Sequence, residues 1–163
     1  MQKLEIQIAV EDGDWPAEDV LEAISERVLT AAAEFLAVEG QPFPAMPTEL
    51  SLVFTSDEDI RAINAEWRSQ DKPTNVLSFP AYPIVPGDTP GPMLGDIIIA
   101  RETVEREAVE LGKSFDDHLT HLMVHGFLHL FGYDHMEDEE AEEMEGLETR
   151  ILARLGLSDP YAV

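Results

Sequence analysis

Three histidines close together in the sequence are the residues most able to do chemistry. They are His125, His129 and His135, in the stretch HGFLHLFGYDH. On a helix, positions four residues apart lie on one face, so the first two imidazoles can reach one ion. Gly132 permits a left-handed residue that ends the helix, and the chain can then turn back and bring the third histidine to the same ion.

Three nitrogen ligands predict an open, catalytic metal site. Structural zinc sites usually have four protein ligands, whereas three leave a position for water or substrate. Zinc held in this way lowers the pKa of a bound water to about 7 and polarises a carbonyl or phosphoryl oxygen, which makes hydrolysis the predicted reaction class. We expect one zinc ion per chain, although imidazole also accepts nickel, copper or iron.

The same spacing occurs in the zinc-protease motif H-E-x-x-H-x-x-G-x-x-H, with one difference. The glutamate that is the general base of these proteases follows their first histidine, and Gly126 occupies that position here. The sequence therefore predicts a zincin-like metal helix without the protease base. A zinc-dependent metallopeptidase-like hydrolase remains an alternative that Gly126 disfavours.

Hydrolysis also needs a proton acceptor and a group that neutralises developing charge. Asp134 precedes the third histidine, where it either accepts a proton or orients a ligand; with equal weight, it caps the turn after Gly132. Arg68 is the candidate for charge neutralisation, because a guanidinium binds phosphate through two parallel hydrogen bonds. The alternative for Arg68 is an ordinary exposed arginine.

Polar side chains follow Arg68 in a loop that leads into a predicted strand, where functional residues commonly lie. We expect His121, one turn before His125, to support the site, and His118 to be solvated in the first turn of its helix. The predicted substrate-binding residues are Arg61, Arg68, Lys72, Thr74, Asn75 and Ser78.

Apolar periodicity predicts the elements that must hold these residues. Strands are expected at about 3–10, 50–54, 75–79 and 95–100, and helices at about 16–38, 57–67, 101–111, 114–131 and 137–155. The strand at 95–100 ends in four apolar residues, which suggests a central strand covered on both faces. In the second helix Trp67 is expected to point inward, and in the first helix the residues expected to do so are Val20, Ile24, Val28, Ala31, Phe35 and Val38.

These elements predict one α+β (α/β-like) domain over residues 1–163. In it a small mixed four-stranded sheet packs with about five helices, and the metal helix lies against the sheet. No apolar run of about 18 residues is present, so no membrane helix is expected. The N-terminal residues alternate like a strand rather than a signal peptide, and cysteine is absent. These features together predict a cytoplasmic protein.

The net charge is −24, from 10 basic and 34 acidic residues, which argues against a general nucleic-acid binder. The charges are unevenly placed. Nine acids and no lysine or arginine lie between Asp134 and Glu148, and we expect those from Glu137 to Glu145 to form a solvated helix face. From Arg61 to Lys72, the sequence contains three basic residues and only two acids.

The residues assembled so far resemble the YbeY family of bacterial endoribonucleases, which mature ribosomal RNA. The resemblance rests on HGxxHLxGYDH from His125, including its glycine, on WRSQDKPTNVLSFP from Trp67, and on LGDI from Leu94. These blocks occur in the family's order and cover about residues 50–150. The first 45 residues resemble the family only in their strand–helix layout.

The resemblance implies a single-strand-specific, metal-dependent endoribonuclease that acts in 16S rRNA 3′-end maturation and ribosome quality control. It implies zinc on the three histidines, with His125 and Arg68 as the critical pair. A phosphodiester needs charge neutralisation by metal and arginine, which accounts for the missing protease glutamate. Attack by water and attack by a ribose 2′-hydroxyl both remain open.

The implied partners are single-stranded ribosomal RNA and the small ribosomal subunit. Our hypothesis is that RNA meets a local basic patch of Arg61, Arg68 and Lys72, while a ribosomal protein or GTPase supplies the remaining affinity. The second alternative function is a non-catalytic ribosome assembly factor whose metal is structural.

Overall fold

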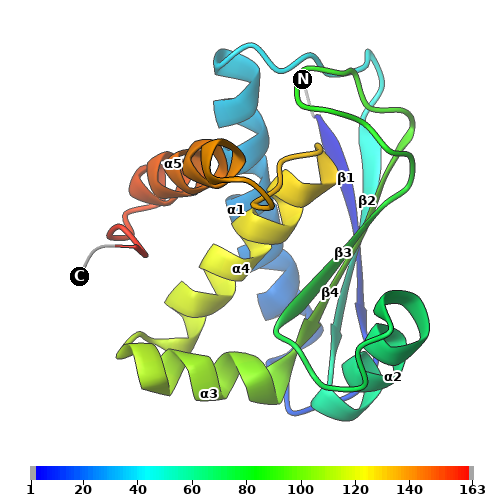
Figure 1. Ribbon diagram of the computed structural model, residues 1–163, viewed down its shortest axis with the longest axis vertical. Helices are drawn as coiled ribbons and strands as arrows, with labels where there is room; N and C mark the ends of the chain where they lie inside the picture. The colour runs from blue at the N-terminus through cyan, green and yellow to red at the C-terminus, as the bar shows by residue number, and fades with distance from the viewer. Residues whose placement is uncertain (1–2, 162–163) are drawn as a thin grey trace.

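A computed structural model describes residues 3–161, and in these residues a four-stranded sheet packs with five helices (Figure 1). The strands are β1 (Leu4–Val10), β2 (Thr48–Thr55), β3 (Val76–Pro80) and β4 (Met93–Ala100). The helices are α1 (Glu18–Val38), α2 (Asp57–Arg68), α3 (Arg101–Leu111), α4 (Phe115–Leu130) and α5 (Asp138–Arg154). The predicted α+β class, the number of strands and the number of helices are confirmed.

The sheet is mixed and has the order β1-β2-β4-β3. Strand β2 pairs parallel with both β1 and β4, whereas β3 pairs antiparallel with β4 and forms an edge. Along β4, Ile97 and Ile99 belong to the main core, and Ile98 packs in a smaller cluster with Ile60 and Leu77. Strand β4 is therefore covered on both faces, as its apolar sequence predicted.

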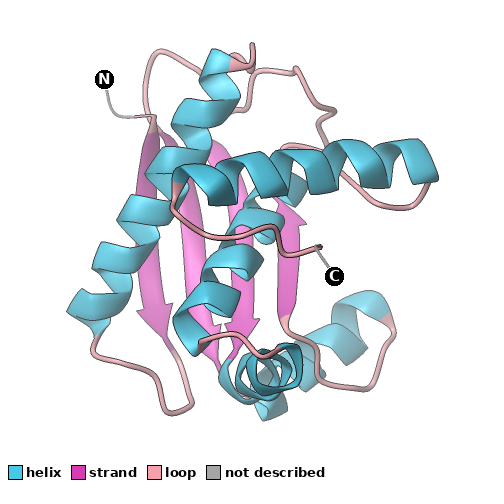
Figure 2. Ribbon diagram, turned by 90° about the vertical axis from the view of Figure 1, so that its left-hand side faces the viewer, coloured by secondary structure: helices cyan, strands magenta, loops and turns pink. Residues whose placement is uncertain are grey.

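The helices are distributed unequally between the two faces of the sheet. Helices α1 and α4 cover one face, with α5 crossing above them, and α2 packs on the other (Figures 1 and 2). The prediction that Trp67 points inward is wrong, because its side chain is 67% exposed. Trp67 lies in the last turn of α2, where its ring packs edge-on with Phe79 on the edge strand β3.

The buried face of α1 is rotated slightly about the helix axis from the face that was predicted. Val28 and Phe35 are buried, but Val20 and Val38 at the two ends are exposed. The buried stripe also contains residues that the predicted frame left out, namely Leu21, Leu29, Ala32 and Leu36. The helix crosses the sheet and α4 along this stripe, so its ends extend past the core.

Helix α4 runs through the middle of the helical layer and contacts β3, β4, α1, α3 and α5. Ser114 caps its N-terminus by accepting a hydrogen bond from the Asp117 amide at 3.1 Å, as predicted. The buried positions Leu119, Met123 and Phe127 recur at helical spacing. None of the helices within residues 3–161 is long and apolar enough to cross a bilayer.

Candidate metal centre and its cavity

The chain reverses directly after α4, and Gly132 makes the reversal possible. Its φ is +95°, in the left-handed region that favours glycine. The Tyr133 amide donates to the Leu128 carbonyl at 3.2 Å, which closes the end of the helix. A Cβ at position 132 would also collide with the backbone of Ile84, in the loop between β3 and β4. Glycine is thus required both by backbone conformation and by the close approach of this loop.

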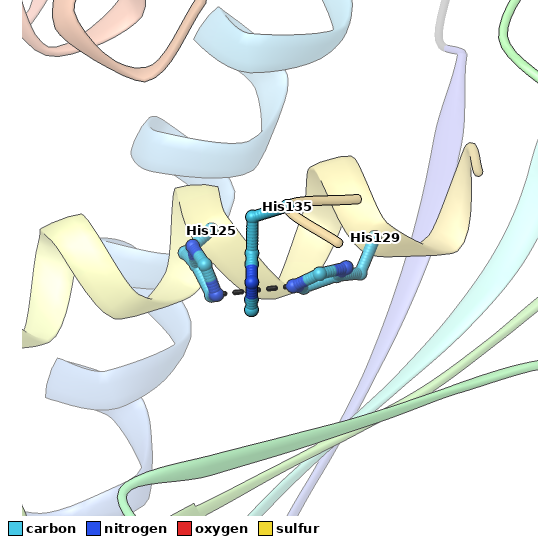
Figure 3. Close-up of side chains that lie close together, drawn as sticks. All are labelled: His125, His129 and His135. Atoms are coloured by element: carbon cyan, nitrogen blue, oxygen red, sulfur yellow. Dashed lines mark hydrogen bonds between the residues drawn. The ribbon is translucent and has the colours of Figure 1, made fainter. Parts of the chain in front are cut away.

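The reversal brings the three predicted ligands together, as Figure 3 shows. One ring nitrogen from each of His125, His129 and His135 lies within 4.8 Å of the others. The Nε2 atoms of His125 and His129 are 3.0 Å apart. The first two rings are half-buried and the third is exposed, so the cluster lies at the surface end of α4.

The hydrogen bonds behind these rings define which nitrogen faces inward. His129 Nδ1 lies 2.9 Å from the Tyr133 carbonyl, which can only accept, so Nδ1 carries the hydrogen. His125 Nδ1 likewise donates to a Glu148 carboxylate oxygen at 3.0 Å. In the neutral rings both Nε2 atoms then present lone pairs to each other, an arrangement that a cation between them would stabilise. The donor set therefore fits a divalent metal.

The protonation of His129 agrees with this role. Burial, together with the charges of His125 and His135, lowers the pKa of His129 to about 4. The ring is therefore neutral near pH 7, and neutral imidazole is the form that binds a metal.

A cavity of about 610 Å³ opens beside the histidines. Strand β3 and the segment before it form one wall, and the turn after α4 forms another. Arg68 enters the same cavity from the end of α2. The predicted site residues that line it are Arg68, Thr74, Asn75, Ser78, His125, His129, Asp134 and His135.

Arg68 is held against the edge strand. Its Nη2 donates to the Ser78 carbonyl at 2.8 Å, and its guanidinium carbon lies 5.0 Å from the centre of the Phe79 ring. A guanidinium has five N–H donors, so this contact leaves others for a ligand in the cavity. The geometry suits an arginine that binds an anion beside the metal.

The other two predicted basic residues lie outside the cavity lining. Arg61 forms an exposed ion pair with Asp71, with Nε 2.9 Å from Oδ1. This hydrogen bond and charge lower the pKa of Asp71. Lys72 contributes its backbone carbonyl, which accepts from the Asn64 amide group at 2.9 Å. Substrate binding by Arg61 and Lys72 thus remains a prediction.

The polar residues of the β3 wall make structural contacts. The Asn75 amide nitrogen donates to Glu107 at 2.9 Å, and the Asn75 side-chain oxygen accepts from the Val76 amide at 2.7 Å. The Ser78 hydroxyl donates to the Gly126 carbonyl at 3.1 Å, which ties β3 to α4. These contacts shape the wall that a substrate would meet, while direct binding by these residues remains a prediction.

Gly126 lies where α4 touches the sheet most closely. A Cβ at this position would approach Ile97 Cγ2 and Ser78 Oγ to 3.0 Å, and Val76 Cγ2 to 3.3 Å. The position therefore faces strands β3 and β4, and Val76 and Ser78 of β3 also line the cavity. A larger side chain here would press against these strands, because each contact is tighter than an ordinary Cβ contact, so the packing disfavours the protease arrangement of the general base.

Asp134 lines the cavity and also supports the turn. Its Oδ1 accepts a hydrogen bond from the His135 amide at 2.7 Å. This contact fits the turn-capping role, and the position on the cavity wall fits the proton-accepting role. The two roles are compatible, since a carboxylate has a second oxygen.

The residue of the site that sequence reasoning missed is Glu148 on α5. It lies just beyond the acids from Glu137 to Glu145 that were predicted to be solvated, and it is fully buried. Burial alone would raise the pKa of Glu148, but hydrogen bonds from His121, His125 and Tyr161 outweigh it and lower the pKa to about 2. The signal was its spacing of four residues from Met144, on the apolar stripe of the helix.

His118 was predicted to be solvated, and this is also wrong. Only 3% of the residue is exposed. Its Nε2 donates to the Glu107 carboxylate at 2.9 Å, across the contact between α3 and α4. The first turn of α4 is covered by α3, which the sequence of α4 alone could not reveal.

The comparisons with known proteins agree on one family. The family model described as Endoribonuclease YbeY matches residues 7–156. Proteins named endoribonuclease YbeY from Allorhizobium ampelinum and Rhizobium meliloti are 75% and 74% identical over 162 residues, covering 99% of this chain and 97% and 96% of theirs. The solution structure of TM1509 from Thermotoga maritima has the same fold, with a TM-score of 0.57 at 23% identity over 98% of this chain and 100% of its own. The chain therefore belongs to the YbeY endoribonuclease family.

Proposed function

We propose that this protein is a metal-dependent endoribonuclease that cleaves single-stranded RNA and acts in 16S rRNA 3′-end maturation, with residues 1–163 forming one domain. The observation that carries the proposal is the placement of Arg68 and the three histidines in one cavity. Relatives of at least 74% identity over nearly the full chain bear the endoribonuclease name. As a factor of ribosomal RNA, it would work in the cytoplasm with the small ribosomal subunit.

Zinc is the metal that we propose for His125, His129 and His135, because three imidazoles in an open site suit it. When bound, such an ion supplies Lewis-acid polarisation of a phosphodiester oxygen and activation of a hydroxyl nucleophile. The chain contributes by fixing the three rings on one helix and one turn.

Arg68 would neutralise the charge that develops on the phosphate during cleavage. Its attachment to the Ser78 carbonyl holds the guanidinium at the cavity wall before the substrate arrives. Because the group is preorganised, it does not have to be ordered again in the transition state. We further propose that Asp134 accepts the proton of the attacking hydroxyl, with its Oδ1 bond to the His135 amide fixing its direction.

The metallopeptidase alternative is disfavoured by Gly126, which lacks the carboxylate of the protease base and packs closely against the strands. The alternative of a non-catalytic assembly factor is separated from the proposal by activity. We expect that Arg68→Ala lowers kcat/KM for a defined single-stranded RNA by about 10²-fold, the typical effect of removing one preorganised donor. The measurement is cleavage of a fluorescent oligonucleotide by zinc-loaded protein.

Arg27→Ala is the matched control, since Arg27 is exposed on α1 and lies outside the cavity lining. This variant changes the net charge equally and should cleave at the wild-type rate. Removal of the metal by a chelator should abolish cleavage, and added zinc should restore it. Full activity of Arg68→Ala, together with the same melting temperature as wild type, would refute the proposed role of the arginine.

A further inference from the structure

The C-terminal tail reaches the metal site from behind the ligand helix. After α5 the chain folds back, and Asp159 Oδ1 accepts hydrogen bonds from the Tyr161 amide at 2.8 Å and from the Thr149 hydroxyl at 3.3 Å. The Tyr161 ring then packs edge-on against the His121 ring, with centroids 5.7 Å apart. Tyr161 is thus placed by specific contacts, although it lies close to the end of the chain.

Tyr161 and two histidines meet at the buried carboxylate of Glu148. Its Oε1 accepts from His121 Nε2 and from His125 Nδ1, both at 3.0 Å. Its Oε2 accepts from the Tyr161 hydroxyl at 2.7 Å. A fully buried carboxylate is costly unless several donors compensate for lost water, and here two donors from α4 and one from the tail do so.

This arrangement matters because His125 belongs to the metal triad. A carboxylate that accepts from Nδ1–H fixes the tautomer in which Nε2 offers its lone pair to the ion. It also restricts rotation of the ring and makes the ligand nitrogen more basic. His129 obtains the same tautomer from the neutral Tyr133 carbonyl. Of these two rings, His125 is therefore the one whose Nδ1 donates to a negatively charged group.

We propose that Glu148 and Tyr161 are positioning residues of the metal centre: the carboxylate orients His125, and the tail hydroxyl orients the carboxylate. The inference rests on the proposed metal-dependent function. On this proposal the C-terminal tail helps to position the metal ligand His125 and does not serve packing alone. A purely structural role for the same hydrogen bonds predicts a less stable protein with unchanged metal binding.

The test compares zinc affinity in four variants with that of the wild type. Glu148→Gln keeps the size of the side chain but removes its charge, and Tyr161→Phe removes only the hydroxyl. The matched controls are Glu142→Gln, an exposed position on α5, and Tyr82→Phe, an exposed tyrosine outside the cavity lining. Affinity is measured by competition with a chromogenic chelator, and the visible spectrum of cobalt-substituted protein reports coordination geometry.

We expect Glu148→Gln to weaken zinc binding by about 10- to 100-fold, the usual effect of losing a partner behind a ligand. Tyr161→Phe should give a smaller loss in the same direction, and both should alter the cobalt spectrum. The controls should match the wild type in both measurements. Since Tyr161 is 43% exposed, its variant decides the question even where Glu148→Gln fails to fold.

Two results would overturn the inference. One is wild-type zinc affinity and cobalt spectrum in Tyr161→Phe and folded Glu148→Gln. The other is a lowered melting temperature of the metal-free variants with unchanged affinity, which would assign the network to stability alone. Failure of the wild-type protein to bind zinc is a different result, because it contradicts the proposed function itself.

Discussion

Gly126 is unfavourable for helix stability but allows α4 to pack closely against the sheet. A glycine inside a helix costs about 1 kcal/mol relative to alanine, so it needs a compensating reason. The reason here is the approach of α4 to the sheet, where Ile97 and Ser78 occupy the space of a Cβ. The same contact makes a larger side chain such as glutamate unfavourable at this position, so close packing and the absence of a protease base go together.

Gly126→Ala should therefore destabilise the protein instead of stabilising it. The gain in helix propensity, about 1 kcal/mol, is smaller than the cost of overpacking, about 1–3 kcal/mol. Gly146→Ala on α5 is the control, since nothing lies within 4 Å of its Cβ, and it should stabilise. Urea unfolding of the metal-free proteins measures both changes; stabilisation by equal amounts would show that α4 can move away from the strands.

The cluster of three histidines could be predicted because their relation is local. His125 and His129 share a helix turn, and a glycine turn returns His135. Glu148 could not be assigned in this way, because its two histidine partners lie more than 20 residues away in sequence. One carboxylate among nine acids is singled out only when α5 packs against α4.

At the scale of helices and strands, the sequence predicted the existence of each element well. It predicted less well which residues at the ends of an element are buried against its neighbours. Periodicity located all four strands and all five helices of the described residues, since each carries an apolar pattern of its own period. The errors fall at the margins of the sheet. Trp67 and Val38 follow the apolar period of their helices but extend past the layer that would bury them.

The junction of α3 and α4 carries a prediction about pH. Burial lowers the pKa of His118 below its ordinary value of 6.5, although Glu107 opposes the shift; His121 and Lys113 add to it. Its Nδ1 is buried without a partner among the described residues, so protonation would leave an unpaired N–H. The unfolded chain then binds more protons than the folded one just below pH 6.5, and stability falls as pH falls.

His118→Gln should make stability depend less steeply on pH, because glutamine can donate to Glu107 but does not titrate. We expect the free energy of unfolding of the wild type to fall more steeply than that of the variant between about pH 7.5 and pH 5.5. Measuring both proteins metal-free keeps the titration of the remaining histidines the same in each. Parallel curves would show that His118 titrates alike in the folded and unfolded chains.

Across the whole molecule, the charge distribution is unfavourable for binding RNA. The net charge is −24, and the first turn of α5, with Asp138, Glu139 and Glu140, begins three residues after His135. Arg68 is the only lysine or arginine among the residues that line the cavity, and Arg61 is already paired with Asp71. A phosphate chain that leaves the cavity past His135 therefore approaches the acids of α5, which supports the proposal that a partner supplies further affinity.

This view predicts weak binding and an unusually small salt dependence for the protein alone. For single-stranded RNA the slope of log K against log salt is about −0.7 per phosphate neutralised, so one or two contacts give a slope no steeper than about −1.5. Arg68→Ala should reduce the slope by about 0.7, and Arg27→Ala should leave it unchanged. Fluorescence anisotropy with a short labelled RNA, with zinc bound and a non-cleavable backbone, measures these slopes. A slope near −5 for the isolated protein would mean that about seven phosphates are neutralised, and the need for a basic partner would disappear.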